Sequence, residues 1–230
     1  MKVFFKTALF LLVTHFAAGQ QIRIGAKGAF NLSNVSKFEL ADQVLPDFKM
    51  LPSGGGGLFA EIPLSNDFSF RPEVSFAVKG SRLEDINLGK LIDQSWASLI
   101  NAEARILLSY IDVPLLVKYK FGKSELGRGY IIAGPGLAFK VGDDLKMKFL
   151  GGAIPTQFPL NLDYNPVEFS GHVGAGYEFP LGNNITGFVE AKYQQGFTNI
   201  VKDWGAFEFR TRNQNVGISA GISIPLGARK

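Results

Sequence analysis

Strict alternation between apolar and polar residues is the feature that most constrains the fold of this chain. In residues 68–79, FSFRPEVSFAVK, every even position is apolar and nearly every odd position is polar or charged. Successive residues of a β-strand face opposite sides, so this segment has one apolar face and one charged face. Such an apolar face lies either in the core of a soluble β-protein or on the lipid side of a closed barrel.

Seven further segments alternate in the same way and are predicted to be strands. Within 105–121, for example, Ile111, Val113 and Leu115 fall on one face, and Asp112 and Lys118 fall on the other. The segments are roughly ten residues long, as expected for strands that cross a membrane at a tilt. The remaining predicted strands are 22–32, about 57–64, 130–141, 169–179, 185–197 and 215–226.

Short and long connections between these strands alternate along the chain. Tight turns are expected at 65–67 and 181–184 and a modest turn at 122–129, because they are rich in Asn, Asp, Gly and Ser. Outer-membrane barrels have short periplasmic turns and long external loops, whereas a soluble sandwich has no reason to sort its loops by length. The chain is therefore predicted to be all-β, an eight-stranded antiparallel up-and-down transmembrane β-barrel. The long connections are 33–53, 80–104, 142–168 and 198–214.

The first residues have the pattern of a secretion signal. Lys2 and Lys6 provide a positive start, residues 7–13 form a short apolar run, and Ala17 and Gly19 are small residues before a cleavage point. We expect residues 1–19 to be a cleaved signal peptide and residues 20–230 to form one barrel domain. The chain has no Cys, so it has neither disulfides nor a lipid-anchored cysteine.

Two further regularities agree with a barrel. A cadence of polar residue, apolar residue, Pro and Leu occurs at 61–64, 112–115, 178–181 and 223–226, mostly where a strand approaches a turn. Because its strand continues, Pro114 is expected to mark a β-bulge. Aromatic residues gather near both ends of the predicted strands, as expected for two interfacial girdles. They are Phe68, Phe70, Tyr119, Phe121, Tyr130, Tyr177 and Phe179 at one end and Phe30, Phe76, Phe139, Tyr193 and Phe197 at the other.

Four motifs resemble a known family. Residues 71–80 (RPEVSFAVKG), 110–119 (YIDVPLLVKY), 24–33 (IGAKGAFNLS) and 133–136 (AGPG) are similar, in order, to strands of the PorT-like outer-membrane β-barrel proteins of the Bacteroidetes. The resemblance implies an eight-stranded barrel of OmpA/OmpX-like size, and its namesake is associated with a secretion system. Asp112 stands where that family usually has Glu. The C-terminus, residues 227–230, lacks the terminal aromatic residue of many outer-membrane proteins.

Charged residues on the inner face are expected to fill the lumen. The interior of an eight-stranded barrel is just wide enough to be filled by side chains, and an isolated buried charge is costly. We therefore predict an interlocked plug of basic and acidic side chains, with inward glycines making room for it. The predicted lumen charge network consists of Arg23, Lys27, Glu61, Arg71, Glu73, Lys79, Asp112, Lys118, Glu178, Glu190 and Lys192.

No pattern in the sequence predicts catalysis, a metal site or a cofactor. His172 is expected to face inward, but the spacing couples it to none of Ser75, Ser219 and Ser223. The run Gly54–Gly57 lacks the Lys-Ser/Thr of a phosphate-binding loop and is expected to be a flexible connection into a strand. Asp143 and Asp144 are expected to be a solvated pair.

With a closed lumen, function is expected in the external loops. Residues 83–104 are predicted to form a short amphipathic helix over the mouth, and 142–168 are apolar for a loop. Both are candidates for docking a partner. The sequence thus favours a non-enzymatic protein of the outer membrane of a Gram-negative bacterium, structural or partner-binding. Its expected partners are outer-membrane lipid and envelope or secretion-system proteins. The small net charge, +4 including Lys2 and Lys6, gives no indication of nucleic-acid binding.

Three alternatives stay open from the sequence. The first is a small-solute, porin-like channel. The second is a membrane-embedded enzyme that uses His172. The third is a soluble, calycin-like ligand binder, which would need an apolar interior.

Overall fold

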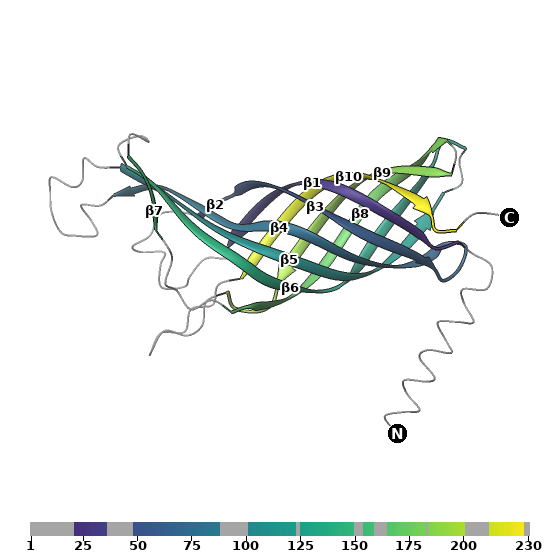
Figure 1. Ribbon diagram of the computed structural model, residues 1–230, viewed down its shortest axis with the longest axis horizontal. Helices are drawn as coiled ribbons and strands as arrows, with labels where there is room; N and C mark the ends of the chain where they lie inside the picture. Colours follow the sequence, from purple (N-terminus) through teal and green to yellow (C-terminus); the bar gives the residue numbers. More distant parts are fainter. Residues whose placement is uncertain are drawn as a thin grey trace, which may run out of the picture.

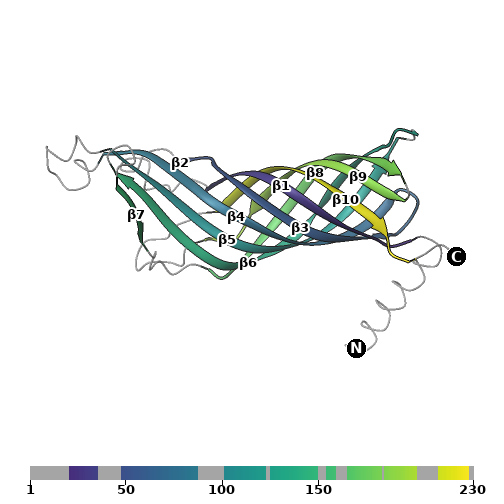
Figure 2. The ribbon, with the colours of Figure 1, turned by 45° about the horizontal axis from the view of Figure 1, so that its top comes forward.

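Eight long antiparallel strands close into a barrel in the computed structural model, which describes residues 21–35, 48–87, 101–122, 125–149, 154–158, 165–182, 184–200 and 212–227. Each long strand pairs with its neighbours in the order β4-β3-β1-β10-β9-β8-β6-β5, and a β4–β5 pairing closes the circle (Figures 1 and 2). The barrel strands are β1 Arg23–Val35, β3 Leu51–Pro63, β4 Phe68–Asn87, β5 Asn101–Phe121, β6 Arg128–Phe149, β8 Val167–Gly182, β9 Ile185–Gly196 and β10 Asn213–Pro225. The predicted fold class is confirmed.

Two short strands lie beyond the barrel wall. β2, Phe48–Lys49, pairs with β4, and β7, Ile154–Phe158, pairs with β6. The sequence did not predict either strand. The described residues contain no helix that is long and apolar enough to cross a membrane.

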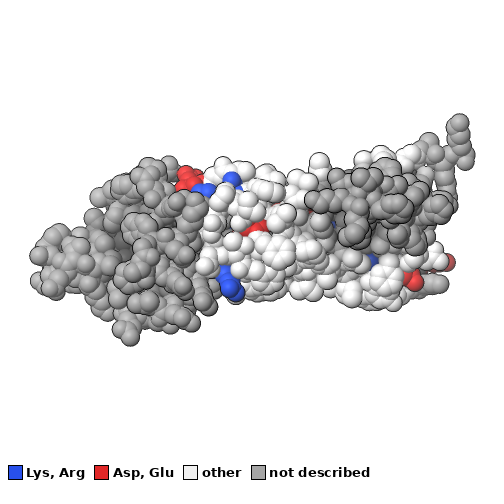
Figure 3. Space-filling view, turned by 90° about the horizontal axis from the view of Figure 1, so that it is seen from below, with Lys and Arg blue, Asp and Glu red and all other residues white. Residues whose placement is uncertain are grey.

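The wall of the barrel is apolar outside and polar inside. On β4 the outward Val74 and Phe76 are 53% and 44% exposed, whereas the inward Arg71 and Glu73 are each 1% exposed. The space-filling view shows the same contrast, because most of the visible wall is uncharged (Figure 3). A soluble calycin-like binder would have the opposite arrangement. That alternative is therefore wrong.

Strands β4, β5 and β6 are longer than predicted and project past the other strands at the end opposite Arg23 of β1 and Pro225 of β10 (Figure 1). Residues 80–87, 101–104 and 142–149, predicted as connections, are strand residues. The helix predicted over 83–104 is therefore wrong at both of its ends, and residues 88–100 lie outside the described part of the chain. Main-chain pairing extends these strands beyond the membrane, where no lipid imposes an apolar outer face.

The glycine run Gly54–Gly57 lies inside β3, so the predicted flexible connection is wrong. Its backbone pairs on both sides, with Gly55 opposite both Ala29 and Ala77. Sheet hydrogen bonds use the main chain, so flanking strands can hold a segment that has low β-propensity.

The bulge expected at Pro114 is also absent from the described β5 ladders. The register is the same on both sides of Pro114, and the irregularity in the β5–β6 ladder falls between Ser109 and Tyr110 instead. There Val141 of β6 is the additional residue, because Ser109 pairs with Gly142 and Tyr110 with Lys140.

The aromatic girdles are formed as predicted at most positions, but Tyr130 is not part of them. Its side chain is fully buried and points into the lumen, where its hydroxyl donates to Glu190 at 3.0 Å. Tyr130 has the same parity as the buried Ile132, whereas Ile131 is exposed, so the alternation of β6 was the available signal.

Candidate functional site

The polar lumen is the candidate functional site. All the residues of the predicted lumen charge network lie on the inner face, and most of them are buried. The structure arranges them as three clusters at successive levels: a central cluster, a periplasmic cluster beside the short turns and an outer cluster toward the projecting strands.

Arg71 is the middle of the central cluster. Its Nη1 donates to Glu190 Oε2 at 2.8 Å, and its Nε lies 3.0 Å from Glu73 Oε1 as an ion pair. The guanidinium also lies over two aromatic rings, 4.1 Å from the centroid of Phe59 and 5.1 Å from that of Phe188. A planar cation can use its edge for carboxylates and its faces for rings, which is why arginine suits this position.

Two lysines complete the central cluster. Lys27 Nζ lies 2.7 Å from Glu73 Oε2 and 3.4 Å from Glu190 Oε1, and Lys192 Nζ lies 3.1 Å from Glu73 Oε2. Glu73 thus contacts three cations, supplied by β1, β4 and β9. Burying these charges costs several kcal/mol per ion, and mutual contact is what offsets that cost.

Small residues leave space for this packing. A side chain at Gly176 would overlap the ring of Tyr130, and one at Gly221 would overlap Phe188 and the stem of Lys27. The prediction that inward glycines make room for the plug is consistent with both positions.

The periplasmic cluster joins β3, β5 and β8. Lys118 Nζ lies 2.9 Å from Glu61 and 2.5 Å from Glu178, and Lys120 Nζ lies 2.6 Å and 3.4 Å from the same two carboxylates. Lys118 also lies 4.2 Å from the ring centroid of Tyr130, which links this cluster to the central one. Arg23 lies on the same rim and donates to Thr186 and Ser223 of neighbouring strands.

The outer cluster contains an acid that the sequence analysis missed. Glu168 accepts from Lys79 Nζ at 3.1 Å and also from Gln194 and Asn213, and Asp112 lies 3.8 Å from the same lysine. The predicted strand began at residue 169, which left Glu168 in a loop. The alternation continues through residue 168 and was the available signal.

His172 contacts a serine that the sequence did not single out. Its Nε2 lies 3.0 Å from Ser170 Oγ, which also accepts from Gln194 at 3.3 Å. In the described residues Nδ1 of His172 has no hydrogen-bond partner, so no carboxylate orients this imidazole as catalytic triads require. The arrangement is that of a hydrogen-bonded lumen histidine. Ser219 and Ser223 are buried elsewhere in the lumen.

A small cavity lies inside the described part of the barrel. The cavity lies in the lumen between the central and outer clusters and has a volume of about 40 Å³. It is lined by Asp112, Lys192, Gln194, Asn215 and Ser219 among others. A water molecule occupies about 30 Å³ in the liquid, so this cavity holds about one. Among the described residues no group of His, Cys, Asp and Glu could hold a metal ion.

Comparison with known proteins identifies the type of barrel. Residues 16–202 match the family described as "Outer membrane protein beta-barrel domain". No curated protein matches the sequence.

Among solved structures, the chain is similar to the outer membrane protein OprG from Pseudomonas aeruginosa, with a TM-score of 0.50, 10% identity and coverage of 90% of this chain and 97% of that one. It is also similar to Ail, the attachment invasion locus protein of Yersinia pestis (TM-score 0.39, 16% identity, coverage 89% and 100%). A third is the outer membrane protease OmpT from Escherichia coli (TM-score 0.40, 13% identity, coverage 90% and 95%). Likeness at these identities concerns the fold alone, and a fold by itself assigns no activity.

Proposed function

Because the chain belongs to the outer membrane protein beta-barrel domain family and therefore resides in the outer membrane, we propose that it is a non-enzymatic, non-conducting barrel that presents its outer end to partner proteins. The observation that carries this proposal is the contact of Glu73 with three cations in the middle of the lumen, beside a cavity of only about 40 Å³. The eight-stranded interior is narrow enough for such a network to fill it.

A small-solute channel is the main alternative, and bilayer recordings separate the two. We expect the refolded wild-type protein to give no conductance steps in a planar bilayer. The double variant Arg71→Ala/Glu190→Ala removes a cation and its carboxylate together and is expected to open an ion path. The matched control is Lys140→Ala/Asp143→Ala, which removes an ion pair of 2.7 Å outside the plug and should stay silent. Steady conductance of the wild-type protein would contradict the proposal.

The projecting parts of β4, β5 and β6 support a partner-binding role. They carry β2 and β7 beyond the barrel and are the only long strands of the described chain that reach so far past the rim (Figure 2). Exposed sheet edges can pair with an extended segment of another protein. The similarity of residues 71–80 and 110–119 to PorT-like proteins of the Bacteroidetes adds an envelope or secretion-system component as the proposed partner class.

Site-specific crosslinking in cells tests this role. A photoreactive amino acid replaces Asp144, which is exposed on the projecting part of β6, and a control replaces Glu125, which is exposed in a periplasmic turn. We expect crosslinks to envelope proteins from position 144. Crosslinks from position 125 alone would place the partner at the periplasmic end and contradict this role.

We further propose that residues 1–19 are removed on export, so that the mature protein begins at Gln20. The intact mass of the mature protein measures this.

A further inference from the structure

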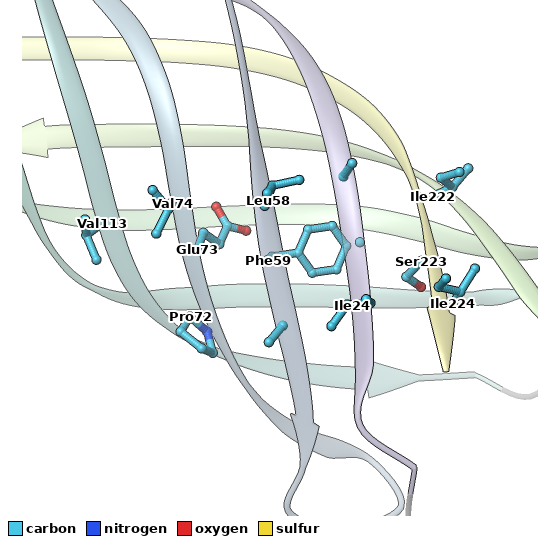
Figure 4. A pocket seen from close by; sticks show the side chains of 13 residues that line it. Ile24, Leu58, Phe59, Pro72, Glu73, Val74, Val113, Ile222, Ser223 and Ile224 are labelled. Carbon is cyan, nitrogen blue, oxygen red and sulfur yellow. The ribbon is translucent and has the colours of Figure 1, made fainter. Parts of the chain in front are cut away.

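The outer wall of the barrel contains an apolar hollow that plays no part in the function proposed above. It has a volume of about 680 Å³ and extends across β10, β1, β3, β4 and β5. Cavities of roughly 300–1,000 Å³ are typical of small-molecule binding sites. In Figure 4 two rows of side chains border it: Val113, Val74, Leu58 and Ile222 in one row, and Pro72, Ile24 and Ile224 in the other.

Two alanines create the depth of this hollow. Ala26 is paired with Leu58, and Ala60 is paired with Ile24, so a small outward residue lies beside a large one in each row. The lining also includes Phe59 and Glu73, whose side chains face the lumen, so the hollow reaches down to the wall itself.

The hollow lies over a seam where main-chain pairing is interrupted. In the described ladders, β3–β4 pairing passes from Phe59–Glu73 to Ile62–Phe70, and β4–β5 pairing from Pro72–Leu115 to Ser75–Asp112, each without the two pairs between. The β5–β6 ladder has a similar gap at Gly134 and Pro135.

Pro72 and Pro114 have no N–H to donate, which accounts for the gaps in the β3–β4 and β4–β5 ladders. The β1–β3, β1–β10, β9–β10 and β6–β8 ladders are continuous over the described residues. Ala60 of β3 lies at the first interruption, so the hollow adjoins the seam there.

We propose that this hollow binds one acyl chain of a phospholipid from the periplasmic leaflet. The hollow continues the lipid-facing wall of an outer-membrane barrel, so hydrocarbon is the medium in contact with it. No charge in its lining is available to a polar ligand, because the carboxylate of Glu73 lies against Lys27, Arg71 and Lys192 in the lumen.

The course of the hollow selects the leaflet. Ile224 and Ile24 lie one residue from the periplasmic ends of β10 and β1, whereas Val113 lies well inside β5. The hollow therefore begins near the periplasmic rim and rises obliquely into the wall, as a chain entering from that leaflet would.

Photolabelling with a defined lipid tests the proposal. The protein is reconstituted in vesicles of phosphatidylethanolamine that contain a trace of the same lipid with a diazirine in its acyl chain. After irradiation, labelled peptides are quantified by mass spectrometry. We expect labelling at Leu58 and Val74 to exceed labelling at Ile131 and Val189, which are similarly exposed on β6 and β9, by about tenfold.

A pair of filling substitutions gives the decisive comparison. Ala26→Leu/Ala60→Leu occupies the hollow and should remove the excess label, whereas Ala175→Leu/Ala191→Leu, on paired outward alanines of β8 and β9, should not. A variant is folded if unboiled and boiled samples of it still migrate differently on a gel. If the filling pair does not fold, Leu58→Ala, which removes a bordering side chain, should lower the excess label instead.

Four outcomes would overturn the proposal. The first is equal labelling of both walls, which indicates ordinary bulk lipid. The second is an excess unaffected by filling the hollow. The third is protein–protein crosslinking through Leu58 and Val74 in place of lipid labelling, which assigns the hollow to a second copy of the chain. A free diazirine fatty acid that labels the hollow while the phospholipid does not would exclude the phospholipid as its source.

Discussion

Glu73 shows how a single residue controls the energetics of the lumen. Three cations contact Glu73, and Glu190 shares two of them, Lys27 and Arg71. Glu73 therefore contacts more buried charges of opposite sign than either of these cations does. Arg71, by contrast, can be removed while Lys27 and Lys192 still face two carboxylates. The acid is therefore the more sensitive partner of this network.

Glu73→Gln is expected to lower the free energy of unfolding by roughly 3–5 kcal/mol, because it leaves buried cations without a counter-charge. Arg71→Met should cost less. Denaturant unfolding of the refolded barrel in micelles measures both. The double variant Glu73→Gln/Lys27→Met should recover part of the loss, and a double variant less stable than Glu73→Gln would show that the charges act independently.

Two strand glycines provide a second test: Gly176 faces the lumen, and Gly28 faces outward. Gly176→Ala should destabilise the barrel by roughly 1–3 kcal/mol, because the added methyl overlaps the ring of Tyr130. Gly28→Ala places the same methyl outside, where nothing lies within 4 Å, and should be neutral or slightly stabilising. Unfolding midpoints of the two variants decide the point, and equal losses would contradict an inward-packed Gly176.

At the scale of elements, the barrel has a continuous side and an interrupted side. The ladders of β1 with β10 and of β9 with β10 run without gaps, whereas those around Pro72 and Pro114 skip pairs. A strand with fewer main-chain bonds opens locally at a lower free energy.

Hydrogen exchange should therefore distinguish the two sides. We expect amides of Val74 and Val113 to exchange about tenfold faster than those of Ala191 and Ile218 in the same reconstituted sample. Nuclear magnetic resonance or mass spectrometry of short fragments gives the rates. Uniform protection around the barrel would mean that the seam does not weaken the wall.

The projecting strands explain why the sequence misjudged the connections. Inside the membrane, lipid on one side and a polar lumen on the other force alternation on every strand. Beyond the rim, residues such as those of 80–87 have no such requirement, and main-chain pairing with β5, and with β2 at Arg82 and Leu83, extends β4. Gly54–Gly57 is the same case within the wall, since flanking strands hold it without any contribution from side chains.

The molecule as a whole behaves as a closed surface without free edges in its membrane-spanning part. Closure satisfies the main-chain hydrogen bonds of most of the wall, and this is what permits strands to cross a bilayer. We expect the protein in the membrane fraction to resist SDS until heated, so that unboiled and boiled samples migrate differently on a gel. Recovery in the soluble fraction without such a shift would contradict the membrane barrel.

The sequence by itself determined the strands, their facing and the sorting of short and long connections, because a period of two is a local property of the chain. It also placed the charges on the inner face. Only the tertiary structure decided which charges meet, because Arg71 and Glu190 are 119 residues apart and become neighbours through barrel closure. The contact of Tyr130 with Glu190 and the apolar hollow likewise depend on register across several strands, which no single segment specifies.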